Sequence, residues 1–247
     1  VDGATHVGVA TDHTIESFRN DLWSGYKTSE GMEPVLLEQI PVLEDALREL
    51  GVAVWAMERH EADDALASAA SCASRDERVR RVRILTPDKD LGQCVEGERV
   101  VQFDRRTGTT IDEAGVRERF GVGPASIPDY LALVGDSSDG FPGLPGWGAK
   151  SAAAVLGRYE HVERIPDDHE RWATDGVAVR GASRLAATLR AGRDDAALFK
   201  RLATLDRTVE VGEVESWRWR GVRPGFAALA TDLGAPFLLD RLQRIGR

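Results

Sequence analysis

The chain has 247 residues, of which 42% are hydrophobic, and a formal net charge of −9. This length allows one large domain or two small ones, and the apolar content supports a substantial core. The negative charge argues against a uniformly basic nucleic-acid binder, but it does not exclude a local basic face beside an acidic pocket.

No apolar run reaches the roughly 20 residues that span a bilayer, and no succession of basic, apolar and small residues marks a secretory signal. We therefore expect a cytoplasmic protein that has no membrane partner. Cys72 and Cys94 fall in no spacing typical of a zinc site or a redox pair, and both are expected to be buried thiols.

Strand and helix patterns alternate through the first half of the chain. The predicted elements are a strand at residues 6–11, a helix at 35–50, a strand at 52–57, a helix at 61–73, and strands at 82–85 and 100–103. Gly51 is the stop signal of the first helix, and Thr107-Gly108 marks a turn. This alternation predicts an α/β layer.

After Gly123-Pro124 the pattern changes to helices joined by turns rich in Gly and Pro, most clearly at residues 140–148. We place a domain boundary near residue 124, which divides the chain into residues 1–124 and 125–247. Near the end, the alternation of Trp217-Arg218-Trp219-Arg220 predicts a half-exposed strand rather than a ladder of aromatic rings that stacks on bases.

Four groups of carboxylates lie at the expected ends of apolar segments. They are Asp12; Glu61, Asp63 and Asp64; Asp88 and Asp90; and Asp136 and Asp139. Each group alone also fits a structural role: acids in a first helical turn, an Asp-rich turn, or a helix cap. Together they favour one pocket, because several buried anions are costly unless cations neutralise them. Two divalent ions about 3.5 to 4 Å apart activate water against a phosphodiester, so hydrolysis of that bond is the expected reaction.

Four phrases make a resemblance specific. They are Glu61-Ala62-Asp63-Asp64, the run from Ile84 to Leu91, Gly135-Asp136-Ser137-Ser138-Asp139-Gly140, and the run from Pro142 to Ala152. In this order they resemble the bacterial 5′-3′ exonuclease and flap endonuclease family, which includes the 5′-nuclease domain of bacterial DNA polymerase I. The resemblance implies a PIN-like (resolvase-like) nuclease domain with a mostly parallel sheet flanked by helices. A helical domain with a helix-hairpin-helix element follows, and its C-terminal segment packs back on the nuclease domain.

The resemblance also implies roles for individual residues. The implied metal ligands, direct or through water, are Asp12, Glu61, Asp63, Asp64, Asp88, Asp90, Asp136 and Asp139. Arg19 and Lys27 match the family's basic residues near the scissile phosphate, where a cation stabilises developing charge. Without the family match, both would be interpreted as surface charges of a helix.

The run Gly143-Leu144-Pro145-Gly146-Trp147-Gly148-Ala149-Lys150-Ser151 is not a nucleotide-hydrolase phosphate loop, because Ala149 separates Gly148 from Lys150. It resembles the hairpin with which the family holds duplex DNA. Gly143, Gly146 and Gly148 would let backbone amides approach a phosphate, with Lys150 and Ser151 beside them. The resemblance further implies that hairpin carbonyls can bind K⁺.

The implied function is a structure-specific 5′ nuclease that uses two or more Mg²⁺ ions, for which Mn²⁺ substitutes. Its substrate is DNA with 5′ ends or 5′ flaps, bound without sequence specificity. We expect a monomer that acts in DNA replication or repair. Its possible protein partners are replication or repair proteins. One alternative is a DNA-binding module of the same fold whose acidic pocket no longer catalyses. Another is a metal-dependent PIN-type RNase, which the helix-hairpin-helix segment disfavours.

Three features depart from the family pattern. The family opens with a strand that carries another metal-binding aspartate, followed by helices, whereas too few residues separate Asp2 from Val7 to hold them. A chain that starts at Val1 without this opening is expected to be an incomplete form of a longer protein. Gly140 stands where the family usually has asparagine, and Glu30 lies where an arginine often follows the Tyr-Lys pair.

Overall fold

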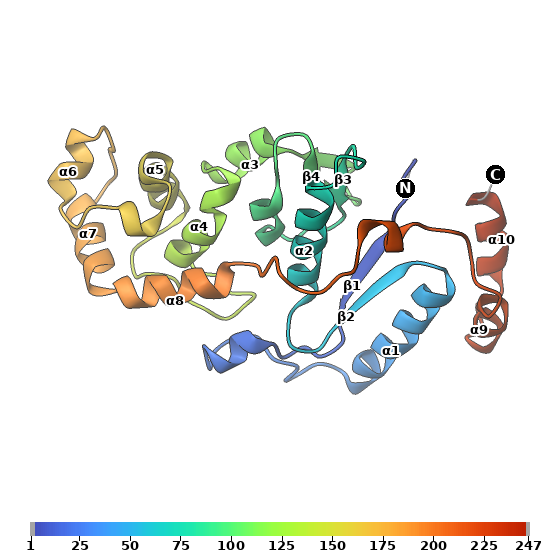
Figure 1. Cartoon of the computed structure of the whole chain (residues 1–247). Helices are drawn as coiled ribbons and strands as arrows, with labels where there is room; N and C mark the ends of the chain where they lie inside the picture. Colours follow the sequence, from blue (N-terminus) through green and yellow to red (C-terminus); the bar gives the residue numbers. More distant parts are fainter. Residues whose placement is uncertain (1–2, 246–247) are drawn as a thin grey trace.

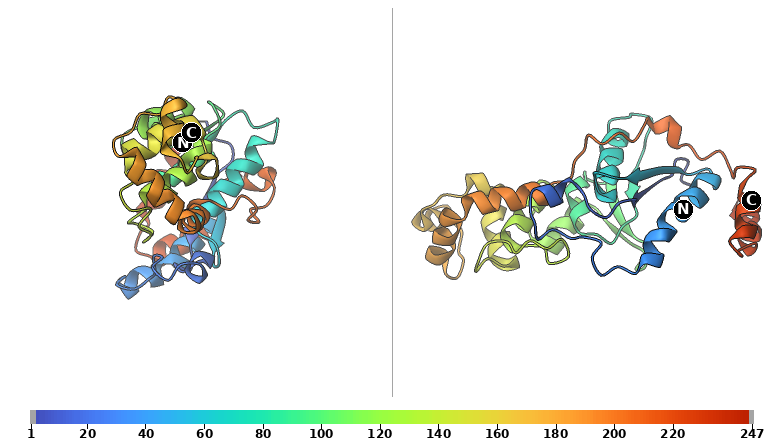
Figure 2. Two further views of the ribbon diagram at one scale, coloured as in Figure 1. Left: turned by 90° about the vertical axis from the view of Figure 1, so that its left-hand side faces the viewer. Right: turned by 90° about the horizontal axis from the view of Figure 1, so that it is seen from below.

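The computed structural model describes residues 3–245, with side chains through residue 242, as an elongated molecule (Figures 1 and 2). All strands lie in the first half of the chain, and a run of helices forms one end of the molecule. The last two helices lie at the opposite end. Among the described residues, no helix is both long and apolar enough to cross a membrane.

The strands form two small sheets. The strands are β1 (Gly8–Asp12), β2 (Ala53–Met57), β3 (Val82–Ile84), β4 (Val100–Asp104) and β5 (Thr109–Ile111). β1 pairs with β2 in parallel, with Asp12 opposite Met57. β3 pairs with β4 in parallel, and β5 adds an antiparallel hairpin strand. The mostly parallel α/β arrangement is confirmed, although its strands are divided between two sheets.

Helix α2 joins the two sheets. The helices of this part are α1 (Pro34–Glu49), α2 (Ala62–Ser74) and α3 (Glu113–Phe120). Ala65, Ala69 and Ala73 face the core that includes Met57 of β2, whereas Ala67 and Ala70 face the core that includes Ile84 of β3. Alanine allows close approach on both sides because its side chain is a single methyl group. The alanine-rich composition therefore lets α2 pack between the two sheets.

Helix α1 departs from the expectation that an apolar stripe is buried. Leu36 and Leu43 are each 52% exposed, and the one fully buried side chain of the helix is Glu44. Its carboxylate accepts hydrogen bonds from the hydroxyl of Thr11 and from Nδ1 of the His13 ring. Polar pairing with the end of β1, rather than the apolar stripe, anchors this part of α1.

The second part of the chain is helical. Its helices are α4 (Ile127–Val134), α5 (Ala149–Tyr159), α6 (His169–Thr174), α7 (Ala182–Ala191), α8 (Arg193–Ala203), α9 (Phe226–Asp232) and α10 (Phe237–Ile245). Short 3-10 helices are η1 (Phe18–Asp21), η2 (Asp90–Cys94), η3 (Pro124–Ser126), η4 (Val162–Arg164) and η5 (Val214–Trp217). α4 packs along α8, and Phe141 stacks on Phe199 of α8. This packing brings the end of α8 to the α/β part.

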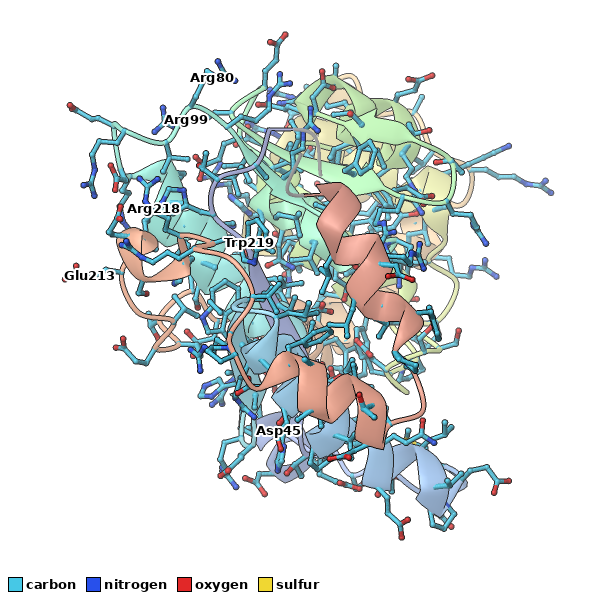
Figure 3. All side chains as sticks on the ribbon, turned by 90° about the vertical axis from the view of Figure 1, so that its right-hand side faces the viewer. Asp45, Arg80, Arg99, Glu213, Arg218 and Trp219 are labelled. Carbon is cyan, nitrogen blue, oxygen red and sulfur yellow. The ribbon has the colours of Figure 1, made fainter. Side chains whose placement is uncertain are left out.

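The prediction of a strand at Trp217–Arg220 is wrong. Trp217 ends η5, and Arg218 forms an isolated bridge with His6. The indole of Trp217 donates to the carbonyl of Val211, and the indole of Trp219 donates to that of Leu50. Figure 3 shows Arg218 and Trp219 on the segment that leads toward α9 and α10. Local alternation suggested a strand, but the hydrogen bonds of the two indoles, of which that of Trp219 reaches a distant segment, decide the backbone path.

Candidate metal and DNA site

The predicted carboxylates come from four places in the fold. Asp12 ends β1, and Asp63 lies in the first turn of α2. Asp90 begins η2 shortly after β3, and Asp136 and Asp139 lie in the loop after α4. The carboxyl ends of parallel strands are where α/β folds place their ligands. The loop after α4 adds acids from the helical part to this edge.

Three of these carboxylates form a tight cluster. Oxygen atoms of Asp90, Asp136 and Asp139 all lie within 4.8 Å of one another. Oδ1 of Asp90 is buried and accepts no hydrogen bond from the described residues, although Nζ of Lys89 lies 3.5 Å away. An unpartnered buried carboxylate oxygen is costly unless a cation approaches it. Hard divalent cations such as Mg²⁺ take oxygen ligands of this kind. The donor set therefore fits a divalent metal ion.

Asp63 and Asp88 lie close enough to Asp90 of this cluster to interact with it electrostatically, and Asp12 interacts with Asp63. Burial, followed by the charge of Asp88, raises the pKa of Asp63 to about 8, and Asp90 and Asp12 contribute to the same effect. Burial and the charge of Asp88 likewise raise the pKa of Asp90 to about 7. The neighbouring carboxylates raise the pKa values of Asp63 and Asp90 because like charges at short range disfavour ionisation. These acids share one electrostatic environment.

Two lysines lie between the carboxylates. Nζ of Lys27 is 2.8 Å from Oε2 of Glu61 and 3.0 Å from Oδ1 of Asp139. Nζ of Lys89 donates to Oδ2 of Asp136 and lies 3.5 Å from Oδ1 of Asp90. Burial alone would lower the pKa of Lys27, but the charges of Glu61 and Asp139 outweigh it, so this pKa is raised. Both ammonium groups are therefore held charged inside the acidic pocket.

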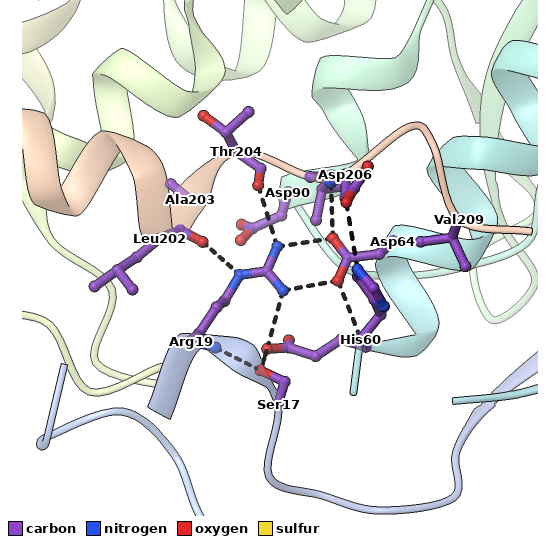
Figure 4. A network of polar contacts seen from close by, with 12 residues as sticks. Ser17, Arg19, His60, Asp64, Asp90, Leu202, Ala203, Thr204, Asp206 and Val209 are labelled. Carbon is purple, nitrogen blue, oxygen red and sulfur yellow. Dashed lines mark hydrogen bonds and ion pairs between the residues drawn. The ribbon is translucent and has the colours of Figure 1, made fainter. Parts of the chain in front are cut away.

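The side chains of Arg19 and Asp64 form a buried ion pair (Figure 4). Both terminal nitrogens of Arg19 donate to the carboxylate of Asp64, at 2.8 and 2.7 Å. The remaining N–H groups of Arg19 donate to Oε1 of Glu61 and to the carbonyls of Leu202 and Thr204. A guanidinium has five N–H donors, so all of them are used.

The acceptor sites of Asp64 are equally occupied. Besides the two bonds from Arg19, its oxygens accept from the backbone N–H groups of Glu61 and Asp206. Asp64 is fully buried and Arg19 is 1% exposed. The geometry therefore argues against the expectation that Asp64 contacts a metal directly and that Arg19 contacts a phosphate directly. Glu61 connects this buried network with the acidic pocket, because Arg19 donates to its Oε1 and Lys27 pairs with its Oε2.

The glycines of the predicted hairpin have different surroundings. A Cβ on Gly143 would lie 2.3 Å from the backbone nitrogen of Gly135, so Gly143 is required by internal packing. A Cβ on Gly146 would lie 3.4 Å from the guanidinium of Arg184, whereas one on Gly148 would meet no atom within 4 Å. Ser151 receives a hydrogen bond from the N–H of Gly148 and donates to its carbonyl. Lys150 is exposed in the first turn of α5.

The departure at Gly140 has a steric reason. Gly140 has a φ of 83°, and a Cβ there would lie 2.0 Å from the carbonyl oxygen of Gly25. The indole of Trp23 donates to the carbonyl of Gly140. Asparagine tolerates a positive φ, but no residue with a Cβ fits this approach without a backbone shift. Gly140 thus allows the segment with Lys27 to lie beside the loop with Asp139.

Two residues of the site were not predicted as such from the sequence. Lys89 lies between Asp88 and Asp90 in the chain, and a lysine flanked by two carboxylates was the available signal. Gln93 is buried; its amide donates to the carbonyls of Asp90 and Ala203, and its side-chain oxygen accepts from the N–H of Leu205. No local pattern indicates these contacts, because they join segments more than 100 residues apart.

The fold and the acidic cluster define a resolvase-like α/β domain followed by a helical domain. The family models for the 5′-3′ exonuclease N-terminal resolvase-like domain and for the 5′-3′ exonuclease C-terminal SAM fold match residues 2–121 and 122–224, respectively. The chain therefore belongs to the 5′-3′ exonuclease family. The resemblance and the fold class predicted from the sequence are confirmed.

Named relatives support this membership. DNA polymerase I of Pseudomonas aeruginosa is 36% identical over 213 residues, which cover 82% of this chain and 22% of that protein. DNA polymerase I of Bacillus subtilis is 32% identical over 245 residues, which cover 96% of this chain and 27% of that protein. The 5′-3′ exonuclease of Aquifex aeolicus is 36% identical over 165 residues, covering 66% of this chain and 56% of that protein. The chain thus spans about a quarter of the polymerase relatives.

Solved structures share the fold at lower identity. T5 5′-exonuclease with bound divalent metal ions (zinc) has a TM-score of 0.65 and 18% identity, covering 94% of this chain and 85% of that chain. The catalytic core of Rad2 in complex with a DNA substrate has a TM-score of 0.57 and 15% identity, covering 94% of this chain and 75% of that chain. These similarities establish the arrangement of the elements.

Proposed function

We propose that this chain is a divalent-metal-dependent 5′ nuclease that hydrolyses phosphodiester bonds at DNA 5′ ends or 5′ flaps, in replication or repair. The observation that carries the proposal is the cluster of Asp90, Asp136 and Asp139 with its unpartnered buried oxygen. Family membership supplies the reaction class. The T5 relative was crystallised with metal ions and the Rad2 core with a DNA substrate, and both agree with it.

The metal site is proposed to consist of the cluster and the carboxylates around it. Asp90, Asp136 and Asp139 would hold the first ion, and Asp12, Asp63 and Asp88 would contribute to a second position directly or through water. Mg²⁺ suits this all-oxygen donor set, and Mn²⁺ is an expected substitute. When bound, the ions supply positive charge that activates water and stabilises the leaving oxygen.

The remaining polar residues divide into two roles. Lys27 is close enough to the carboxylates to offer its ammonium to the scissile phosphate, and a fixed cation there stabilises charge that develops in the transition state. Arg19 and Asp64 act indirectly, because their hydrogen bonds to each other, to Glu61 and to the end of α8 are saturated. We therefore assign Arg19 and Asp64 to positioning Glu61 and the first turn of α2.

DNA is proposed to contact the hairpin at residues 143–151. The open space beside Gly148 and the exposed ammonium of Lys150 suit a backbone phosphate, which carries no base information. The hairpin carbonyls are the proposed site for K⁺. Because the loop with Asp136 and Asp139 directly precedes the hairpin and packs against Gly143, the position of the held duplex and the position of cleavage are linked.

A flap-cleavage assay tests the proposed reaction. Full-length protein incubated with a 5′-labelled DNA flap and Mg²⁺ is expected to release a labelled product, and EDTA is expected to abolish release because it removes the ions. An RNA flap tested in parallel distinguishes the DNA nuclease from a PIN-type RNase, which would cleave the RNA instead. If DNA is bound but neither substrate is cut in Mg²⁺ or Mn²⁺, the protein is a DNA-binding module.

Lys150→Ala tests the hairpin. The variant is expected to weaken binding to duplexes of any sequence alike, and to reduce the slope of log affinity against log salt by about 1, because one phosphate contact is lost. Fluorescence anisotropy with two unrelated duplexes at several salt concentrations measures both quantities. Arg106→Ala, which removes an exposed charge from the β4–β5 turn, is the control and should change neither. A loss confined to one duplex sequence would contradict the assignment.

A further inference from the structure

Lys27 and Lys89 occupy equivalent positions in the acidic pocket. Lys27 joins Glu61, at the start of α2, to Asp139, in the loop after α4. Lys89 joins Asp90, at the start of η2, to Asp136 in the same loop. Each ammonium thus connects a carboxylate of the α/β part with one of the helical part. Both side chains are about one-third exposed, so water can reach them.

The same carboxylates are available to both kinds of cation. The cluster that fits a metal ion consists of Asp90, Asp136 and Asp139, and each of these carboxylates has a lysine ammonium within 4 Å. Mg²⁺ requires oxygen ligands at about 2.0 to 2.1 Å in near-octahedral geometry. An ammonium beside these carboxylates repels an ion in that position and blocks its approach. Metal ions and these lysines therefore compete for the cluster.

We infer that Lys27 and Lys89 are tethered counter-ions of the metal-free pocket, and that a divalent ion binds by displacing them. The inference rests on the metal site of the proposed function and adds a regulation to it. While the lysines are in place, their charges offset the repulsion among the carboxylates, so the pocket stays folded without metal. Once displaced, their ammonium groups are released at the edge of the pocket, where a phosphate can accept their hydrogen bonds. Metal loading would thus prepare the pocket for DNA.

Amine labelling of the unmodified 247-residue chain tests the displacement directly. The chain has four lysines: Lys27, Lys89, Lys150 and Lys200. Lys200 is a matched control, because its ammonium is also paired with two carboxylates, at 2.7 Å from Asp129 and 2.8 Å from Glu163, outside the metal cluster. Lys150 is the exposed reference. Acetylation by an activated ester, followed by peptide mass spectrometry, gives a rate for each lysine.

Addition of Mg²⁺ or Mn²⁺ is expected to raise the labelling rates of Lys27 and Lys89 about tenfold, because a side chain released from its charge-assisted hydrogen bonds is more accessible to the reagent than a paired one. The rates of Lys150 and Lys200 should not change. Unchanged rates for Lys27 and Lys89 at a metal concentration that saturates the protein would overturn the inference. No substitution is needed, so misfolding cannot obscure this result.

Metal titration of Lys89→Met provides the second test. Methionine keeps the unbranched stem but removes the competing charge. Calorimetric titration should therefore show Mg²⁺ binding about tenfold tighter, the equivalent of one lost charge-assisted hydrogen bond. Lys200→Met should bind Mg²⁺ as the unmodified chain does. Equal or weaker binding by Lys89→Met would show that Lys89 supports the metal site instead of competing for it.

The outcomes separate this inference from the proposed function, since neither test measures cleavage. If the unmodified chain binds no divalent ion, the proposed function and the displacement are both rejected. If it binds ions while the lysine rates stay constant, only the displacement fails. Metal-driven release of the lysines together with an inactive flap assay would support the displacement and reject the nuclease.

Discussion

Asp136→Asn is expected to lower the rate of DNA cleavage in Mg²⁺ by at least about a hundredfold, because a metal ligand contributes several kcal/mol to the transition state and each 1.36 kcal/mol changes the rate about tenfold. Asp136 is buried and belongs to the acidic cluster, and its Oδ2 accepts from Lys89. Asparagine keeps the shape and can still accept the hydrogen bond that the N–H of Ser138 donates to Oδ1. The substitution therefore removes charge with little change in the loop.

DNA affinity should survive the same substitution. Asp136 lies in the pocket and not on the hairpin, and removing a negative charge lessens repulsion of phosphate. Single-turnover cleavage and anisotropy in Ca²⁺ or EDTA measure the two effects separately. Asp194→Asn, an exposed acid in the first turn of α8, serves as a control that should cleave normally. Normal turnover by Asp136→Asn would refute the metal site, whereas parallel loss of binding would indicate a disturbed loop.

Arg19→Met is expected to destabilise the protein by about 3 to 5 kcal/mol, because it leaves the carboxylate of Asp64 buried without its cation. The side chains of Arg19 and Asp64 are 1% and 0% exposed, so water cannot replace the lost bonds. The loss also frees the carbonyls of Leu202 and Thr204 at the end of α8. For a chain of this size we expect the thermal midpoint to fall by on the order of 10 °C.

Urea unfolding of Arg19→Met and Arg19→Lys measures this prediction. Lysine keeps the charge but not the two-pronged geometry, so it should recover only part of the stability. A double variant, Arg19→Met with Asp64→Leu, should be more stable than Arg19→Met alone, because it removes the unpaired charge. Arg78→Met, which breaks an exposed pair with Asp76, should leave the midpoint nearly unchanged. A negligible loss in Arg19→Met would contradict the buried network in Figure 4.

The network around Arg19 also links two functions. Arg19 and Gln93 both bind backbone carbonyls in the last residues of α8, and Gln93 also holds the carbonyl of Asp90. The end of α8 is thereby attached to both Asp64 of α2 and the acidic cluster. A shift of α8 would move carboxylates on both sides of the pocket. The proposed DNA-holding part and the proposed cutting part are therefore mechanically connected.

Several features could be predicted from the sequence because their causes are local. Carboxylates at the ends of apolar segments, glycines in the hairpin and the change to helices after Gly123 are all visible within short windows. The alanine-rich run also correctly predicts α2. The two-sheet arrangement was not visible, because strand pairing depends on contacts between distant segments.

The sequence by itself determined the family, the alternation of strands and helices in the first part of the chain and the set of acids available for a metal, since these follow from residue types and their spacing. Only the tertiary structure decided which of those acids lie together in the pocket and which are held in a buried ion pair. Asp63 and Asp64 are neighbours in the chain, yet one lies in the field of Asp88 and Asp90 while the other is paired with Arg19. Helical geometry turns consecutive side chains about 100° apart, and the partner that each one meets comes from a distant segment. The same reason explains why Arg19 supports α2 and α8, and why Lys27 and Lys89 lie between carboxylates in the pocket.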